Sequence, residues 1–517
     1  MDVLRYRDTR GLDHTRPAFT DVILTGIAEG GGLFVPETLP SLPLEDILSF
    51  SALPYPARAA RVLTLFQPDI PPLSIDELSL SAYADQFDDP GVAPLREAQP
   101  GLFLLELWHG PTAAFKDMAL QCLPLLISEA ISRRKDSGEP VDDLLILVAT
   151  SGDTGSAALA GFADIPECRV AVFYPQGGIS ETQLRQMMAL QGEHGTAVGV
   201  QGSFDDCQKM VKSIFRDEAW NQNIHECHHL HLASANSINW GRIPLQVASY
   251  VSAYADLVAM EGAGPGQKVD VCVPTGNFGN ALAAWYARRI GVPIGRIICA
   301  CNENDVLPDF LHSDVWDIRE RDLILTPSPS MDILVSSNLE RLLFEISGDA
   351  AGVRGWMDEL ATSSRFEADE VTMDAIRSEF TGHTVGNDES LEVIRRMHEE
   401  TGYLLDPHTA VAWEIASQTR ERNPMIVVST AHWSKFGENV YRALNGIPFL
   451  DPLPSDVADL PLSALLQEVA RLAPGQPIPR ALSRLDLSVD LSEWLIEATP
   501  DAAEEALTIW LDQRPLS

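Results

Sequence analysis

The amino-acid sequence predicts an α/β fold built on a mostly parallel sheet. Between about residues 101 and 300, short apolar runs alternate with helical stretches of about 10 to 15 residues, a pattern typical of βαβ units. Glycine-rich turns follow three predicted strands, at the strand ends where open α/β sheets bind ligands. With 45% hydrophobic and 21% charged residues, the chain has the composition of a globular protein with ample material for a core.

The positions of the apolar runs give the elements of this core. The expected strands are 102–107, 144–149, 169–174, 196–200, 229–233, 269–273, 296–300 and, later, 425–428. The expected helices lie after Asp117, from Thr154, and over 180–190, 204–217, 240–258 and 280–290. Because helices connect successive strands, we expect those strands to run parallel.

The N-terminal part of the chain is expected to form a domain of its own. Residues 1–95 contain many prolines and the run Gly30-Gly31-Gly32, which limit the length of any helix or strand. We expect a small, mostly helical domain there, with a loop from about 87 to 100 that leads onward. The α/β core then takes in 96–445, as two subdomains.

Two segments lie outside the alternation of strands and helices. Residues 339–401 read as helical and acidic, which suggests an insertion in the core. Residues 446–517 are expected to form a helical extension, because apolar residues recur there at near-helical spacing. These are Leu460, Leu462, Leu465, Leu466 and Val469, followed by the apolar stretch 494–510. The extension contains no lysine, cysteine or histidine, so we expect it to carry no chemistry.

The chain is strongly acidic, with a formal net charge of −37 and a sequence pI near 4.5. This charge disfavours a nucleic-acid or anionic-membrane partner, because both need a basic surface. The seven cysteines show no paired metal spacing and fit a reducing cytoplasm. No signal-peptide pattern and no run of about 18 apolar residues is found, so we expect a soluble, cytoplasmic protein.

Lys116 stands out in the stretch His109-Gly110-Pro111-Thr112-Ala113-Ala114-Phe115-Lys116-Asp117, a largely apolar run that follows a turn signal. Only six of the 37 lysine and arginine residues are lysine, so a lysine here indicates a need for an amine. A desolvated lysine can lose its proton and bond to the carbonyl carbon of a cofactor, which arginine cannot do. The alternative is a Lys116-Asp117 pair at a helix start, with the amine in solvent.

The turn Thr150-Ser151-Gly152-Asp153-Thr154-Gly155-Ser156 follows the strand 144–149 and opens a helix. Its hydroxyls and free backbone N–H groups converge on the positive end of a helix dipole, which suits a carboxylate or a phosphate. The alternative is a capping turn in which Ser151 or Asp153 is the N-cap residue.

The turn Pro274-Thr275-Gly276-Asn277-Phe278-Gly279-Asn280 lies between the strand 269–273 and a helix. Its glycines allow backbone amides to approach a phosphate closely, and a structural turn is the alternative. It matches neither the Walker loop nor G-x-G-x-x-G, which disfavours a nucleotide. The turn 429–436 offers the hydroxyl of Thr430 at a strand end, suited to face a pyridine nitrogen.

Four histidines, His225, His228, His229 and His231, suggest a zinc site at first sight. They lack helical i, i+4 spacing with a nearby acid and lead into a strand, so we expect no metal there. His229 and His231 are expected on one face of the strand, and the other two in the preceding loop.

Together these motifs resemble the threonine synthase family, in the order and spacing of its longer, bacterial and fungal type. The stretches that carry the resemblance are 109–117, 150–155, Ser234-Ala235-Asn236-Ser237-Ile238-Asn239, 276–280, Asp406-Pro407-His408 and Thr430-Ala431-His432-x-x-Lys435-Phe436. Further matches are Tyr6-x-x-Thr9-Arg10-Gly11, Gly31-Gly32-Leu33-Phe34-Val35-Pro36, Ser330-Met331-Asp332-Ile333 and Ser337-Asn338-Leu339-Glu340-Arg341. The resemblance covers about 1–445, with no counterpart recognised after 446. Asp8, Glu29-Gly30 and Trp433-Ser434 depart from the family pattern without removing a reacting group.

The resemblance implies a fold-type II enzyme that uses pyridoxal 5′-phosphate to convert O-phospho-L-homoserine and water to L-threonine and phosphate. Lys116 would carry the cofactor, the amides of 276–280 would bind its phosphate, and Thr430 would face its pyridine nitrogen. The implied cofactor-binding residues are Lys116, Asp153, Gly276, Asn277, Phe278, Gly279, Asn280 and Thr430. The implied substrate-binding residues are Thr112, Ser151, Gly152, Asp153, Thr154, Asn236 and Arg242, the last as a candidate for the substrate phosphate.

Two other functions stay open on the sequence alone. A threonine-synthase-like phospho-lyase would share the early steps but release a 2-keto acid, ammonia and phosphate. An inactive binding protein is disfavoured, because Lys116 and both glycine-rich turns are present. In each case we expect a small-molecule ligand and a monomer or homodimer.

Overall fold

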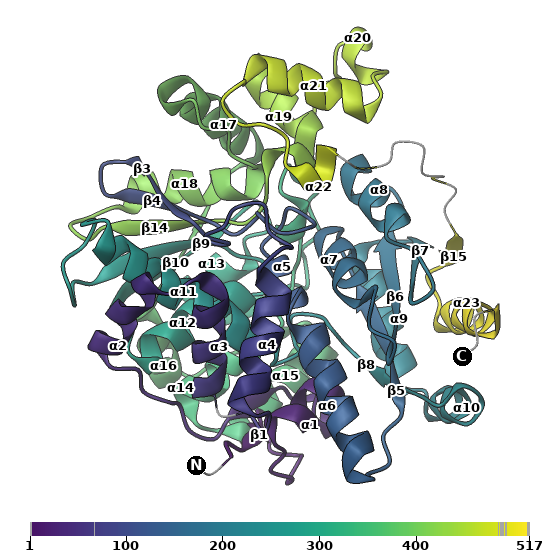
Figure 1. Cartoon of the computed structure of the whole chain (residues 1–517). Helices are drawn as coiled ribbons and strands as arrows, with labels where there is room; N and C mark the ends of the chain where they lie inside the picture. The colour runs from purple at the N-terminus through teal and green to yellow at the C-terminus, as the bar shows by residue number, and fades with distance from the viewer. Residues whose placement is uncertain (1–2, 67, 484, 486–490, 492–493, 514–517) are drawn as a thin grey trace.

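Two mostly parallel sheets surrounded by helices form the centre of the molecule (Figure 1), in a computed structural model that describes residues 3–66, 68–483, 485, 491 and 494–513. The larger sheet has the order β13 (Phe380–Thr384), β10 (Ile294–Cys301), β9 (Val269–Pro274), β14 (Met425–Ser429), β4 (Leu102–Glu106) and β3 (Leu95–Gln99). The smaller sheet has the order β15 (Leu495–Glu497), β7 (Gly195–Gln201), β6 (Cys168–Pro175), β5 (Asp143–Ala149) and β8 (Leu230–Ala233). Both sheets are parallel except for the β3–β4 pair, so the predicted α/β class is confirmed.

The inner strands are buried along their whole length because helices cover both of their faces. Every residue of β6 and of β9 is buried, as expected for a parallel sheet that has no solvent-facing side. The helices that connect or cover the strands are α5 (Asp117–Leu120), α6 (Leu123–Ser137), α7 (Asp153–Phe162), α8 (Glu181–Ala189), α9 (Phe204–Arg216), α10 (Glu218–His228), α11 (Arg242–Ala259), α12 (Gly279–Ile290), α13 (Val306–Ser313) and α18 (Pro407–Thr419).

The N-terminal segment packs directly on the core. Its elements are β1 (Tyr6–Asp8), α1 (Phe19–Thr25), η1 (Glu29–Gly31), β2 (Phe34–Pro36), α2 (Leu44–Ser49), η2 (Phe50–Ala52), α3 (Tyr55–Leu65) and α4 (Pro72–Tyr83). β1 and β2 pair antiparallel, and the indole N–H of Trp240 donates to the hydroxyl of Tyr6 over 3.1 Å. Arg58 bonds Ser252 and Asp256 of α11, both at 2.6 Å. The segment therefore shares one hydrophobic cluster with the large sheet.

Strands are present where the sequence suggested only a loop or helices. The expected loop from about 87 to 100 contains β3, an antiparallel edge strand. The segment 339–401 contains α14 (Leu339–Ser347), α15 (Ala350–Ser363), β12 (Arg365–Glu367), α16 (Glu370–Arg377), β13 and α17 (Asn387–Thr401). β12 pairs with β11 (Val315–Asp317), and β13 extends the large sheet beside β10. The wholly helical interpretation is wrong, because an edge strand such as β13 needs no continuous apolar run.

The C-terminal segment runs over both sheets. After η4 (Trp433–Phe436) and α19 (Gly437–Asn445), its elements are α20 (Ser455–Ala458), α21 (Leu462–Leu472), α22 (Arg480–Ser483), β15 and α23 (Pro500–Gln513). In Figure 1, α20 to α22 lie at the top beside α19, whereas β15 and α23 lie beside the smaller sheet. The expectation of a purely helical extension is wrong, since β15 pairs with β7. Within the described residues, no helix combines the length and the apolar character needed to cross a membrane.

The apolar positions predicted for this segment are only partly those that are buried. Leu462, Leu466 and Val469 of α21 are buried against α19, while Leu465 is half-buried and Leu460 precedes the helix. On α23, Leu507 and Trp510 are buried in a cluster formed with the smaller sheet and α9. The segment thus completes two apolar clusters.

Candidate active site

Loops at the carboxyl ends of strands from both sheets meet around Lys116. The loop after β4 carries Lys116, and it is held against the loop after β14 by a bridge between Ala114 and Ala431. The N–H of Phe115 donates to the carbonyl of Thr430 over 2.8 Å. These contacts fix the backbone of Lys116 at the edge of the large sheet, facing the smaller one.

The conformation of this loop depends on Asp117. Its carboxylate accepts the backbone N–H and the hydroxyl of Thr112, both over 2.8 Å. A side chain at Gly110 would lie 2.5 Å from the Asp117 side chain, so the glycine is needed for close approach. Thr112, predicted to bind substrate, uses its hydroxyl here for this internal contact.

The amine of Lys116 is buried and pairs with Asp153 at the start of α7. Its Nζ lies 3.1 Å from Oδ2 of Asp153, and only 9% of the lysine is exposed. Burial lowers the pKa of Lys116; Asp153 opposes this shift, whereas Lys435 and Arg242 add to it. The interpretation of Lys116 as a solvent-facing residue at a helix start is therefore wrong, and a buried amine of lowered pKa suits a nucleophile.

Asp153 is the most heavily bonded side chain of the site. Besides its contact with Lys116, it accepts hydrogen bonds from Nζ of Lys435 at 2.8 Å, from Nε2 of Gln183 at 2.9 Å and from the hydroxyl of Ser330 at 2.8 Å. Burial alone would raise the pKa of Asp153, but the charges of Lys116 and Lys435 outweigh burial and hold it well below its ordinary value. Asp153 is consequently a carboxylate at neutral pH.

The turn after β5 opens α7 in a way that differs from both expected caps. The hydroxyl of Thr150 accepts the N–H groups of Gly152 and Gly155, at 2.9 and 3.0 Å. Gly152 is the N-cap residue, with φ +119°, and a Cβ there would lie 2.4 Å from Gln183. Neither Ser151 nor Asp153 is thus the N-cap residue. The hydroxyls of Ser151 and Thr154 have no hydrogen-bond partner in the described part of the chain.

The turn after β9 presents a row of free amides. The backbone N–H groups of residues 276–280 donate to no acceptor within the ranges that the structure describes. The carbonyl of Gly276 accepts the hydroxyl of Ser336 at 2.7 Å, and that of Asn277 accepts the backbone and side-chain N–H groups of Asn338. Phe278 has φ +64° and caps α12. With the carbonyls bound on one side, the free amides at the helix start are suited to bind an anion.

Thr430 and His408 complete the wall of the site on the β14 side. Thr430 is almost buried, and its hydroxyl has no partner among the described residues. His408 bonds Asp406 through Nδ1 at 2.8 Å and accepts the backbone N–H of Ser330 at Nε2. That pattern puts the ring proton on Nδ1, so His408 is a neutral support for the Ser330 turn.

Arg242 is a buried cation without a carboxylate partner among the described side chains. It begins α11, is 3% exposed, and donates from Nη1 to the carbonyl of Ala235, while Nε has no partner in that part of the chain. Burial lowers the pKa of Arg242 to about 10, so the guanidinium stays charged at neutral pH. The side-chain oxygen of Asn236, in the preceding loop, is buried and also unpaired within the described residues. The charge and the unpaired Nε of Arg242 suit an anion, whereas the Asn236 oxygen is an acceptor and suits a donor.

Sequence reasoning named Lys116, Asp153, the turn 276–280 and Arg242 but gave no role to four residues of the site. These are Gln183, Ser330, Asn338 and Lys435, all of which contact a predicted residue. Ser330, Asn338 and Lys435 lie in motifs that carry the family resemblance, which was the available signal. Gln183 had no signal, because it is the N3 residue of an ordinary capping box that begins at Ser180.

The histidine run differs from its prediction. His225 and His228 lie in α10 and not in a loop, and His229 ends that helix with φ +53°, so only His231 is in β8. His225 and His231 each place a ring nitrogen 2.9 Å from Oδ2 of Asp142. Their rings stack with planes 15° apart, and the ligand atoms of Asp142, His225 and His231 lie within 4.8 Å of one another.

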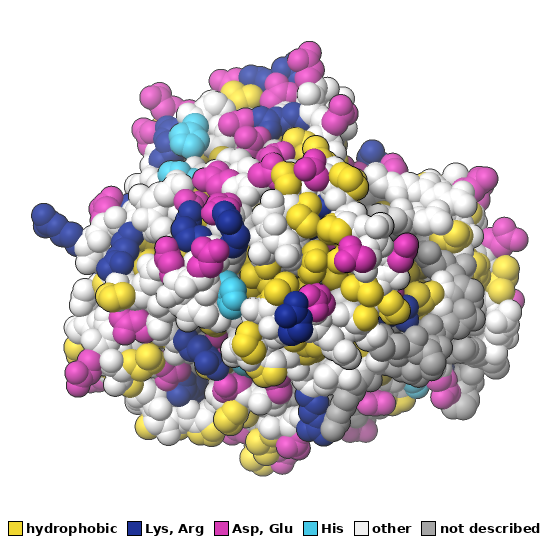
Figure 2. Space-filling model, turned by 90° about the horizontal axis from the view of Figure 1, so that it is seen from above, with side chains coloured by type: hydrophobic (Ala, Val, Ile, Leu, Met, Phe, Trp, Pro, Cys, Tyr) yellow, Lys and Arg dark blue, Asp and Glu magenta, His cyan; other side chains and the backbone are white. Residues whose placement is uncertain are grey.

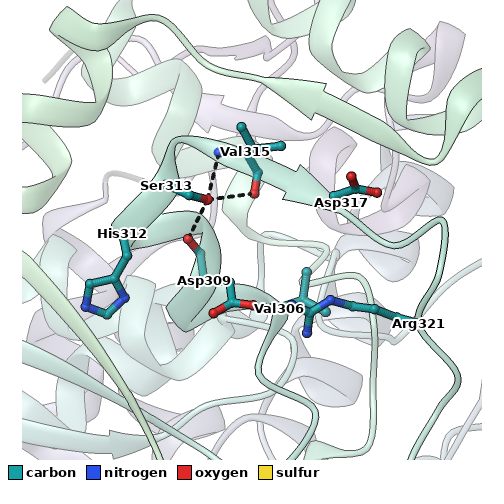
Figure 3. Close-up of a pocket in the computed structure, with 7 residues that line it drawn as sticks. All are labelled: Val306, Asp309, His312, Ser313, Val315, Asp317 and Arg321. Atoms are coloured by element: carbon teal, nitrogen blue, oxygen red, sulfur yellow. Dashed lines mark hydrogen bonds and ion pairs between the residues drawn. The ribbon is translucent and has the colours of Figure 1, made fainter.

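A separate hollow of about 260 Å³ lies beside α13 and β11 (Figure 3). Its one arginine, Arg321, is paired with Asp305 and Asp309. None of the residues around Lys116 lines it. This hollow is therefore separate from the lysine site.

Three family models match the chain. One described as pyridoxal-phosphate dependent enzyme covers residues 88–430, one described as threonine synthase N terminus covers 5–83, and one described as threonine synthase, C-terminal covers 409–471. The third match corrects the sequence interpretation, which found no family counterpart after 446.

Known relatives agree with these matches. Threonine synthase of Pseudomonas aeruginosa is 38% identical over 88% of this chain and 93% of its own length. The human protein named Threonine synthase-like 1 is 40% identical over 82% of this chain, which spans 58% of that protein's length. The PLP-bound threonine synthase from Brucella melitensis superposes with a TM-score of 0.81 at 34% identity, over 98% of this chain and 99% of that chain. The chain belongs to the threonine synthase family of pyridoxal-phosphate dependent enzymes.

Proposed function

We propose that this enzyme converts O-phospho-L-homoserine and water to L-threonine and phosphate with bound pyridoxal 5′-phosphate. The observation that carries the proposal is one buried amine, Lys116, in a site with two separate places for anions, the amides of 276–280 and Arg242. A phosphorylated cofactor and a phosphorylated substrate require two such places. The near end-to-end similarity to the Pseudomonas synthase supports the same reaction.

The residues of the site fit the cofactor. The unpaired amides of 276–280 suit its phosphate, and a Cβ at Gly279 would meet no protein atom closer than 3.4 Å, so the space beside the helix start is open. The hydroxyl of Thr430 suits the pyridine nitrogen, and Asp153 lies beside Lys116. When bound, the cofactor supplies an aldehyde for Nζ of Lys116 and a ring that accepts electrons from the substrate.

The substrate would be held by groups that have no partner in the chain described. The hydroxyls of Ser151 and Thr154, at the start of α7, suit its carboxylate, with Gly152 and Asp153 in the same turn. The guanidinium of Arg242 suits its phosphate, and the neighbouring Asn236 would bind there through its side-chain N–H₂, not through its oxygen. Thr112 stays a predicted substrate contact whose hydroxyl would have to leave Asp117.

Lys116 is the group placed to move protons. Released by the incoming amino group, its Nζ can take a proton from one substrate carbon and return it to the next. Its lowered pKa favours the neutral amine that this role needs.

A phospho-lyase that yields a 2-keto acid, ammonia and phosphate is the second candidate. Identity of 40% with the human protein named Threonine synthase-like 1 is the observation for considering it, since that name separates it from the synthases. The same residues would perform its early steps. The two reactions differ in the product of the last step with water, which is threonine in the synthase and a 2-keto acid with ammonia in the phospho-lyase.

We also infer a cytoplasmic enzyme that acts on a small molecule, as a monomer or homodimer, without a nucleic-acid or membrane partner. The net charge of −37 supports this inference. On the face shown in Figure 2, lysine and arginine side chains are scattered among acidic ones and form no continuous basic area. Size-exclusion chromatography with light scattering would give the oligomeric state.

Product analysis tests the proposed reaction. The enzyme is loaded with pyridoxal 5′-phosphate and incubated with O-phospho-L-homoserine, and threonine, phosphate, ammonia and 2-keto acid are each quantified. We expect threonine and phosphate in equal amounts, and none from Lys116→Ala. Equal amounts of ammonia and keto acid in place of threonine would establish the second candidate. An absence of phosphate release by fully loaded enzyme would overturn both.

A further inference from the structure

The site contains a second lysine, Lys435, that no step described above uses. It lies in η4, and none of its side chain is exposed. Its Nζ donates to Oδ1 of Asp153 and to the carbonyl of Thr112, each over 2.8 Å. A fully buried ammonium group is costly unless its charge is met, and Asp153 is the carboxylate that meets it.

Asp153 therefore holds two ammonium groups, one on each oxygen. Oδ2 faces Lys116 at 3.1 Å and Oδ1 faces Lys435 at 2.8 Å. Its other contacts are neutral donors, Gln183 from α8 and Ser330 from the short helix η3 (Pro329–Met331). Arg242 and His408 also lie near this cluster but do not bond the carboxylate. Lys435 is thus the cation in contact with Asp153 that remains if Lys116 leaves.

We propose that Lys435 is a positioning residue, which keeps the carboxylate of Asp153 paired and in place so that Lys116 is free to bond to the cofactor. The proposal rests on the proposed role of Lys116 as the cofactor lysine. It adds a requirement which that role does not contain, namely a second, permanent partner for Asp153.

The chemistry of attachment shows why the partner matters. The ammonium of Lys116 first gives one proton to solvent. The lone pair of Nζ then bonds to the aldehyde carbon, and the aldehyde oxygen leaves as water with the two remaining amine hydrogens. If Lys116 were the one cation at Asp153, loss of its proton would leave a buried carboxylate unpaired, which is strongly unfavourable. Lys435 removes that cost and also repels the charge on Lys116.

The test measures attachment of pyridoxal 5′-phosphate to the cofactor-free protein between pH 6 and 10. Absorbance gives the rate, and borohydride reduction followed by peptide mass spectrometry gives the modified lysine. We expect Lys435→Met to attach about tenfold more slowly at pH 7, with a pH profile displaced upward by about one unit. Lys435→Arg should restore the wild-type profile, and Lys268→Met, at an exposed lysine, should leave it unchanged.

A double substitution guards against simple misfolding of the single one. Asp153→Asn with Lys435→Met removes the unpaired carboxylate, and we expect it to attach cofactor at the rate of Asp153→Asn alone. Wild-type kinetics and pH profile in Lys435→Met, or an equal loss in both backgrounds, would overturn the inference while leaving the role of Lys116 intact. Modification of a lysine other than Lys116 in the wild type would overturn the assignment of the cofactor lysine itself.

Discussion

Asn338 donates two hydrogen bonds to the carbonyl of Asn277. One comes from its backbone N–H over 3.1 Å and the other from its side-chain amide over 3.2 Å. Asn338 is in turn fixed by Arg341, which is fully buried and also donates to the carbonyls of Phe34 and Ile238. The N-terminal segment and the turn after β9 are thus connected through two side chains. This connection turns the amides of 276–280 toward the site.

Replacing Asn338 with alanine should weaken cofactor binding about tenfold, because the Asn277 carbonyl keeps only the backbone donor and Arg341 loses its contact with the Asn338 side chain. The dissociation constant of pyridoxal phosphate, from fluorescence titration, measures the effect. Asn445→Ala is the matched control, since its amide donates to the Tyr441 carbonyl, away from the turn. Equal affinity in Asn338→Ala and Asn445→Ala would show that the turn is held by other contacts.

Gly279→Ala should abolish tight cofactor binding with little loss of stability. A Cβ there would make only ordinary contacts with the protein, so its cost falls on the ligand. Gly276→Ala is a less clean test, because its Cβ would lie 3.0 Å from the carbonyl of Ser330. Affinity and thermal midpoint are measured together, with Gly355→Ala, in open space on α15, as control. Normal cofactor affinity in Gly279→Ala would mean that the turn serves structure alone.

Arg242→Met should raise KM for O-phospho-L-homoserine about 10- to 100-fold, the worth of one charge-assisted contact to phosphate. Cofactor affinity should stay near that of the wild type, and stability should not fall, because the arginine is buried without a carboxylate partner in the described chain. The KM of Arg242→Lys should lie between that of the wild type and that of Arg242→Met. Steady-state kinetics at saturating cofactor decide this, and an unchanged KM would move the substrate phosphate elsewhere.

The stability of the protein should fall as pH rises through about 9, because of His109. Burial lowers the pKa of His109, but its bonds to Asp88 and Glu106 outweigh burial and raise it from 6.5 to about 9. A folded-state pKa above the unfolded value gives stability that is complete below about pH 6.5 and is lost through pH 9, at most about 3 kcal/mol.

Urea unfolding of the wild type and His109→Gln from pH 6 to 10 measures this contribution. The difference between them should be constant below pH 6.5 and shrink above it. His14→Gln, at an exposed histidine, should give no such trend. Parallel curves for the wild type and His109→Gln over the whole range would contradict the raised pKa.

Leu507→Ala should destabilise the enzyme by about 2–5 kcal/mol without changing turnover per folded molecule. Leu507 is fully buried between α23 and the smaller sheet, and no residue of α23 contacts the lysine site. Ile509→Ala, on the exposed side of the same helix, should change stability by less than about 0.5 kcal/mol. A loss of turnover beyond tenfold in Leu507→Ala, assayed at matched cofactor occupancy, would show that α23 reaches the active site.

The inner strands and the turns that follow them could be predicted from the sequence, because continuous apolar runs and glycine signals have local causes. β5, β6 and β9 lie within about one residue of their predicted bounds. β13, with the sequence Phe380–Thr384, could not be found in this way. It is an edge strand whose place depends on its neighbour β10, which is distant in sequence.

The site shows the same division between local and distant causes. Lys116 was identified from its own surroundings, an amine in an apolar stretch. Its partner Asp153 was named only as a member of a turn, because their contact joins loops of two different sheets. Lys435 and Asn338 act on residues far away in the chain, and no spacing rule contains such a relationship.

β15 has a consequence for the behaviour of the protein in solution. It pairs with β7, which would otherwise be the outermost strand of its sheet. A bare outer strand offers its unpaired backbone groups to any other extended chain, and this is a common route to aggregation. Proteolytic removal of the residues from 494 onward would therefore produce a protein that still contains every group of the active site but self-associates through β7.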